Sequence, residues 1–152
     1  MTNPLIPTKG NPISISDELQ KWALEILDMG FECFCDGDYQ PFIFLVNEDG
    51  EKDMINVAEV NGNIDSNLIE TARQIVAKAC SFAKIYIIVS AGCLHKDGVK
   101  CDTVVAEAGE KGESEALVFA QRYIENNEFE SFEKVGRPAI VNTVENLLNY
   151  DV

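Results

Sequence analysis

The sequence predicts a single α+β domain in which helices pack on a mainly antiparallel sheet of about five strands, in the order α-β-β-α-β-β-β-α. Two segments place apolar residues at i, i+3 and i+4, which is the period of an amphipathic helix. The other apolar segments are short, and turn sequences such as Asp97-Gly98 separate them, which is typical of hairpins. Runs of strands joined by short turns favour this fold class over a regular alternation of strands and helices.

The first helix is expected to begin at Ser14 or Ser16, whose hydroxyls can cap free backbone amides. Gly30 is expected to end it in a left-handed conformation. The apolar stripe between these ends is Leu19, Trp22, Ala23, Ile26 and Leu27. This helix is therefore expected to cover one face of the sheet.

A second helix is expected to start at Asp65 or Ser66, with an apolar stripe that reaches Ala83. A short last helix is expected from Pro138 to about Leu148, with Pro138 in its first turn, where the missing N–H costs nothing, and with Ile140, Val144, Leu147 and Leu148 as its apolar residues. The predicted core includes Trp22, Ile26, Leu27, Ile75, Val76, Ile87 and Val89.

The strands are predicted from short runs of apolar and β-branched residues between turn signals. A short strand over residues 31–35 precedes a hairpin, and residues 85–89, apolar on both faces, form the central strand. Residues 92–100 are expected to be a loop. The passage from residue 53 to residue 91 is expected to add one parallel pair. The predicted strands are residues 31–35, 41–46, 53–60, 85–89, 103–108, 116–123 and a short edge strand at 132–135.

The ends and the cysteines indicate a cytoplasmic protein. Residues 1–13 contain three prolines and a glycine, so we expect a flexible arm there and one domain over residues 14–152. The N-terminus lacks the basic start and apolar stretch of a secretory signal. Five cysteines, an odd number, favour reduced thiols in a reducing compartment.

The formal charge of −14 is unevenly distributed. Residues 28–53 carry eight acids against Lys52, residues 107–133 carry a net charge of −6, and residues 73–100 a net charge of +4. A strongly negative surface repels nucleic acid and anionic lipid, which argues against nucleic-acid and membrane partners. The same surface would attract a basic protein, and the opposite segments would allow two copies to match each other.

The cysteines and the single histidine suggest two kinds of chemistry. Cys33, Cys35, Cys93 and His95 include the ligand types that zinc prefers, but one residue between Cys33 and Cys35 is too few for a zinc knuckle. We therefore expect no metal and no cofactor. Cys93 or Cys101, with His95 as base and Asp97 or Asp102 as orienting carboxylate, would form a thiol site if the fold brought them within hydrogen-bond reach.

The lead interpretation is a non-catalytic binding or regulatory module that self-associates as a homodimer. Strand 116–123, with apolar residues on both faces, offers an edge or a face for a second copy. Lys96 and Lys100 are candidates for contact with an anion or an acidic partner. Two alternatives stay open: a thiol- or metal-assisted hydrolase with its site at Cys93, His95 and Asp97, and an acidic inhibitor or immunity-type partner of a basic protein.

Overall fold

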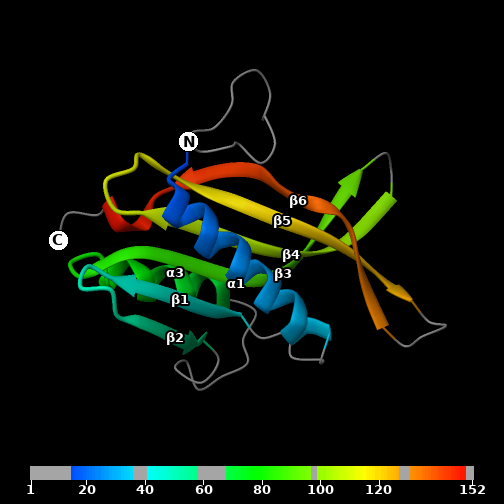
Figure 1. Ribbon diagram of the computed structural model, residues 1–152, viewed down its shortest axis with the longest axis horizontal. Coiled ribbons are helices and arrows are strands. Elements are labelled where there is room, and N and C mark those ends of the chain that lie inside the picture. Colours follow the sequence, from blue (N-terminus) through cyan, green and yellow to red (C-terminus); the bar gives the residue numbers. More distant parts are fainter. Residues whose placement is uncertain (1–14, 36–40, 58–67, 97–98, 127–130, 150–152) are drawn as a thin grey trace.

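The chain forms a six-stranded antiparallel sheet with one long helix on one face and a shorter helix on the other (Figure 1). The structure is a computed structural model, and it describes residues 15–35, 41–57, 68–96, 99–126 and 131–149. Side chains are not described at residues 35, 93–96, 99–101, 125–126, 131 and 149. The predicted α+β class is confirmed, with six strands in place of about five. The predicted arm at residues 1–13 lies outside the described residues.

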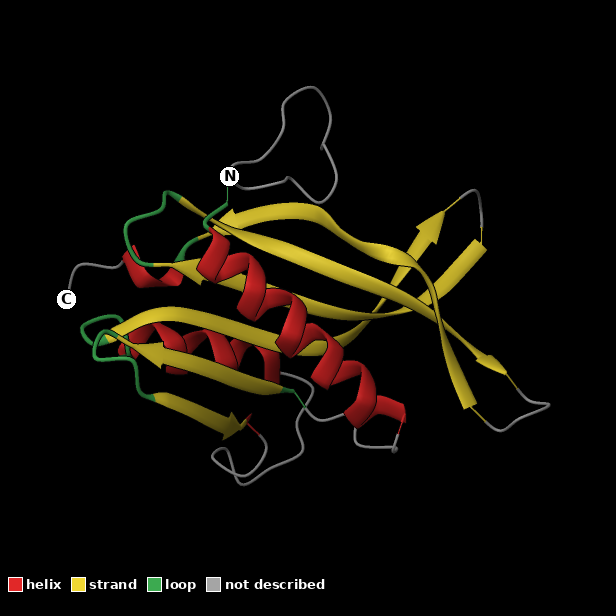
Figure 2. Cartoon of the chain, in the orientation of Figure 1, coloured by secondary structure: helices red, strands yellow, loops and turns green. Residues whose placement is uncertain are grey.

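The strand order across the sheet is β2-β1-β3-β4-β5-β6, and each neighbouring pair is antiparallel. Figure 2 shows the long strands of the β3–β6 half extending beyond the helices. The strands are β1 (Phe42–Asn47), β2 (Lys52–Asn56), β3 (Ala83–Lys96), β4 (Val99–Glu110), β5 (Glu115–Asn126) and β6 (Ser131–Glu145). The predicted central strand lies within β3, inside the sheet.

Helix α1 (Asp17–Cys35) covers one face of the sheet, mainly over β3 and β4. The hydroxyl of Ser16 accepts a hydrogen bond from the amide of Leu19 at 3.1 Å, which confirms the predicted cap. The helix continues through the predicted stop at Gly30, so the prediction of a strand at residues 31–35 was wrong. Phe31 and Phe34 are buried and extend the apolar stripe by another turn.

The absence of a side chain at Gly30 serves helix packing. A Cβ at this position would lie 2.5 Å from Val89 Cγ1, closer than two carbon atoms can approach, and 3.1 Å from Val104 Cγ1. Glycine therefore lets the α1 backbone approach β3 and β4 directly. Of the predicted core residues, five are buried, while Trp22 and Ile75 are partly buried against the core.

Helix α3 (Leu68–Lys78) and the short 3-10 helix η1 (Leu147–Asn149) pack on the opposite face. The sheet thus separates two apolar clusters, a larger one under α1 and a smaller one under α3 and η1. The start predicted for the second helix lies outside the described residues. In the part of the chain that the structure describes, no helix is long and apolar enough to cross a membrane.

Three predictions about the sheet were wrong. Strands β2 and β3 run in the same direction, but β1 lies between them and pairs antiparallel with both, so no parallel pair forms. The predicted loop at residues 92–100 belongs largely to a hairpin, in which β3 continues to Lys96 and β4 begins at Val99. Strand β5 lies between β4 and β6, so the segment 116–123 is not an edge.

The predicted last helix was also wrong. Residues 140–145 belong to β6, an edge strand that pairs with β5, and only Leu147–Asn149 are helical. The apolar residues Ile140 and Val144 fit a helical period, but pairing with β5 makes this segment a strand. A register shift between the two residues places Ile140 in the cluster under α1 and Val144 against the cluster under α3. Pro138 is tolerated there because edge strands and bulges do not require its N–H.

Candidate functional site

A groove with a volume of about 470 Å³ lies between helix α1 and strand β6. We call it the α1–β6 groove. The α1 wall carries two leucines and two acids, and the β6 wall carries a lysine and an arginine. Its lining residues are Leu24, Glu25, Leu27, Asp28, Gln121, Lys134, Gly136, Arg137 and Pro138.

A bulge in β6 shapes the strand wall of the groove. Ala120 of β5 pairs with Ala139, whereas Arg122 pairs with Val135, so Gln121 alone faces residues 136–138. Two extra residues on one strand bend that strand and interrupt its ladder. Gly136 has φ of +71°, a left-handed conformation that favours glycine.

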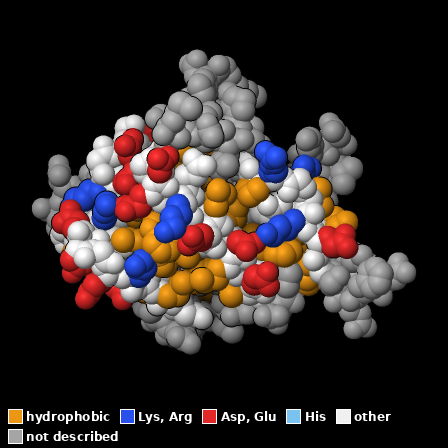
Figure 3. Space-filling model, viewed as in Figure 1, with side chains coloured by type: hydrophobic (Ala, Val, Ile, Leu, Met, Phe, Trp, Pro, Cys, Tyr) orange, Lys and Arg blue, Asp and Glu red, His pale blue; other side chains and the backbone are white. Residues whose placement is uncertain are grey.

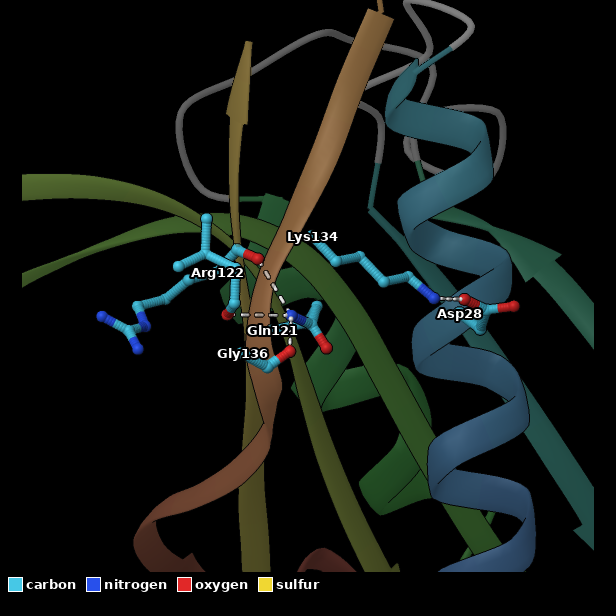
Figure 4. Close-up of polar contacts among 6 residues, drawn as sticks. Asp28, Gln121, Arg122, Lys134 and Gly136 are labelled. Carbon is cyan, nitrogen blue, oxygen red and sulfur yellow. Dashed lines mark hydrogen bonds and ion pairs between the residues drawn. The ribbon is translucent and has the colours of Figure 1, made fainter. Parts of the chain in front are cut away.

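Gln121 stabilises this bulge from β5. Its side-chain amide nitrogen donates to the carbonyl oxygens of Arg122 at 2.9 Å, Gly136 at 3.2 Å and Val135 at 3.4 Å. The residue is only 3 % exposed, and Figure 4 shows its amide directed at the β6 backbone. A buried side chain thus supplies the partners that carbonyls at a broken ladder would otherwise lack.

The two walls of the groove carry balanced charges. Lys134 reaches from β6 to Asp28 on α1 in an ion pair (Figure 4). Its ammonium lies 5.2 Å from the centre of the Phe31 ring. Glu25 and Arg137 are exposed, and neither has an ion-pair partner among the residues described. The four charges that line the groove therefore sum to zero, and one of each sign has no partner in the part of the chain that the structure describes.

A second cleft, of about 230 Å³, lies on the opposite face of the sheet beside α3 and η1. Arg73 lines it together with Glu70, Gln74, Ala77 and Leu147. The Arg73 guanidinium forms an ion pair with Glu107 of β4, and the Tyr86 hydroxyl donates to the other oxygen of that carboxylate at 2.5 Å. These contacts connect the helix to two strands.

Burial dominates the titration of this cluster. The Glu107 side chain is 12 % exposed, and burial raises the pKa of its carboxyl although Tyr86 and Arg73 act to lower it. Burial, together with the nearby Glu107 charge, also raises the pKa of Tyr86 above its usual range. The Tyr86 ring is fully buried, and a Cβ on Gly109, its partner on β4, would lie 2.3 Å from Tyr86 Cε1. The cluster therefore has the character of a structural connection.

The predicted thiol and metal residues occupy three places in the fold. Cys33 and Cys35 lie in the last turn of α1 rather than on a strand. Cys93 and His95 lie near the end of β3, where they pair with Asp102 and Lys100 of β4, and Asp97 lies outside the described residues. Of these cysteine and histidine side chains only that of Cys33 is described, and it is partly buried. The expected absence of a metal and the alternative of a thiol site therefore both stay predictions.

Lys96 and Lys100 flank the turn of the β3–β4 hairpin, with Lys100 opposite His95. Their side chains are not described, so their proposed contact with an anion or a partner is untested by the structure. Within the described ranges, no group of three or more histidine, cysteine or acidic residues is placed to hold a metal ion.

Sequence reasoning did not find the residues of the α1–β6 groove. Asp28 and Lys134 are 106 residues apart in the chain, and no local motif connects them. Only the Gly136–Pro138 pair carried a signal, since glycine and proline close together within a strand pattern favour a bulge at an edge.

Comparisons of this chain with protein-family models, with curated proteins and with solved structures found no match.

Proposed function

We propose that this protein is a non-catalytic binding module and that its partner binds in the α1–β6 groove. The observation that carries the proposal is the groove itself. Its volume of about 470 Å³ falls within the usual range for binding sites, about 300–1,000 Å³. Apolar residues of α1 and β6 line it beside a few charged groups, which is the composition that gives both affinity and orientation.

The chemistry of the walls fits recognition better than catalysis. Four charged side chains line the groove, and all four are exposed to solvent. Catalytic charges act most strongly in sites that exclude water, whereas charges at a wet rim mainly select and orient a partner. The rigid bulge, anchored by Gln121, holds the β6 wall in a defined shape before any partner arrives.

Photo-crosslinking in the native host tests this proposal, because it captures whichever protein occupies the groove. A p-benzoylphenylalanine replaces Leu24 in the groove or, as the control, Phe82, which is 47 % exposed in the turn after α3. We expect a discrete crosslinked product from position 24 that Arg137→Glu abolishes, and no such product from position 82. A failure of position 24 to crosslink, or a product unaffected by Arg137→Glu, would contradict the groove as the binding site.

A further inference from the structure

The unmatched charges of the α1–β6 groove suit a second copy of the same chain. We propose that two copies associate about a two-fold axis, with Glu25 of each copy paired to Arg137 of the other. This inference rests on the proposed function above and names the partner. It also gives the self-association predicted from the sequence a specific surface.

Symmetry makes one charge match count twice. Glu25 lies on the helical wall and Arg137 on the strand wall, and neither has an ion-pair partner among the described residues. In a two-fold pair, any contact from the first residue to the second is repeated from the second copy to the first. An acid on one wall and a base on the other, neither paired with another described residue, therefore give the groove the arrangement that self-pairing requires.

The charges that line the groove cancel, although the chain as a whole is strongly acidic. The whole chain carries −14, yet Glu25, Asp28, Lys134 and Arg137 together carry no net charge. Figure 3 shows basic and acidic side chains interspersed around apolar ones on the face that carries α1. By contrast, the β1–β2 turn exposes Glu48, Asp49 and Glu51, and of these Glu48 alone pairs with a lysine, Lys111, among the ion pairs of the described residues. A second copy that approached over that turn would meet like charges.

The apolar lining would supply most of the contact. Leu24 and Pro138 are partly buried in the isolated chain and line opposite walls of the groove. When the α1 wall of one copy enters the groove of the other, these side chains become covered in both copies. The exposed charges then fix orientation and partner choice, and the apolar contacts hold the pair together.

Strand β6 is poorly suited to the obvious alternative, in which two edge strands pair to form a continuous sheet. Pro138 lacks an N–H to donate, and the bulge at residues 136–138 bends the strand. Both features protect an edge against pairing with another chain. The groove beside β6, rather than its backbone edge, is therefore the surface that we assign.

A charge exchange tests the pairing directly. Sedimentation equilibrium of the full chain at about 0.1 M salt, where charges beyond about 10 Å are screened, measures the dimer dissociation constant. We expect Glu25→Arg and Arg137→Glu each to weaken the dimer by about tenfold or more, because each places like charges together twice. The double exchange should recover the wild-type constant to within about threefold, because it restores both pairs in reverse.

Two variants away from the groove provide matched controls. Glu51→Arg, in the exposed β1–β2 turn, makes the same change of charge as Glu25→Arg. Lys78→Glu, at an exposed position of α3, makes the same change of charge as Arg137→Glu. The circular dichroism and thermal unfolding of every variant establish that it is folded. A monomeric wild type at all concentrations, a double exchange that fails to recover, or controls that weaken the dimer equally would each overturn the inference.

The crosslinking experiment separates this inference from the proposed function. A wild-type monomer that crosslinks through position 24 to a different protein would overturn the two-fold pair and keep the groove as a binding site. If that crosslinked protein is basic, the result would support the alternative role as an acidic inhibitor. Absence of any groove-dependent product would overturn both.

Discussion

Gly30 on α1 and Val89 on β3 lie so close that a Cβ on residue 30 would stand 2.5 Å from Val89 Cγ1. The contact lies in the C-terminal half of the helix that covers the sheet, and Val89 is fully buried. The distance between α1 and the sheet is therefore set by the absence of one side chain. That contact explains why a glycine occurs inside a helix that would otherwise gain stability from almost any other residue.

We predict that Gly30→Ala destabilises the protein by about 1–3 kcal/mol through overpacking. The sign of the change in unfolding free energy is diagnostic, because a glycine-to-alanine change at an open position in a helix would stabilise the protein by about 1 kcal/mol. In a Val89→Ala background the penalty should shrink, because Val89 Cβ would then be the nearest atom of residue 89, at 3.8 Å. Urea unfolding of the two single variants and the double variant measures the coupling. Equal effects of Gly30→Ala in both backgrounds would show that Val89 is not the obstacle.

The same glycine shows where sequence reasoning succeeded and where it stopped. The stripe from Leu19 to Leu27 and the Ser16 cap are local signals, and both predicted α1 correctly. Gly30 carried a local signal for a helix end, but its actual role depends on a strand about sixty residues away, which no window of the sequence contains. A helix end at Gly30 leaves Phe31 and Phe34 outside the helix, and only then does their segment fit a strand.

Pairing partners explain the other errors. Residues 92–100 contain the turn sequence Asp97-Gly98, which is typical of a loop, yet the β3–β4 ladder includes residues 92–96 and 99–100. Residues 138–145 fit a helix or a strand equally well, and β5 decides between the two. The candidate site depends on such non-local contacts throughout, because the α1–β6 groove exists only once α1, β5 and β6 are assembled.

The Glu107 carboxylate should make stability depend on pH in a defined direction. Burial raises its pKa above the usual value of 4.5, so the folded state holds the proton more tightly than the unfolded state does. The stability from this group is then fully present below pH 4.5 and is lost as pH rises through the raised pKa.

Comparing the wild type with Glu107→Gln isolates the contribution of this carboxyl. The variant has no titrating group at position 107, whereas all other carboxyls titrate in the same way in both proteins. We expect the unfolding free energy of the wild type, relative to the variant, to fall as pH rises above 4.5 and then to level off. Urea titrations of both proteins across this pH range provide the measurement. A difference that stays constant or increases with pH would mean that Arg73 and Tyr86 outweigh burial.

Gln121 should be required for the shape of the β6 wall. We expect Gln121→Leu to cost about 1–3 kcal/mol, since it leaves carbonyls at the bulge without their donor in a buried position. Gln74→Leu on the exposed surface of α3 is the control and should change stability by less than about 0.5 kcal/mol. Chemical denaturation gives both values, and a loss for Gln121→Leu no larger than the control would remove the anchoring role.

The dimer should respond to salt in two stages. At very low salt the net charge of −14 repels a second copy at long range, and ions screen that repulsion first. Dimer formation should therefore strengthen as salt rises toward about 0.1 M, where the Debye length is about 10 Å. Well above that range the Glu25–Arg137 pairs are screened in turn, so the gain should stop.

Light scattering across a salt series, with Arg137→Glu measured in parallel, distinguishes the two stages. The variant carries a still larger negative charge, so its residual association should keep rising with salt and show no such limit. A single monomer mass at every salt and protein concentration would instead leave the acidic charge as an aid to solubility.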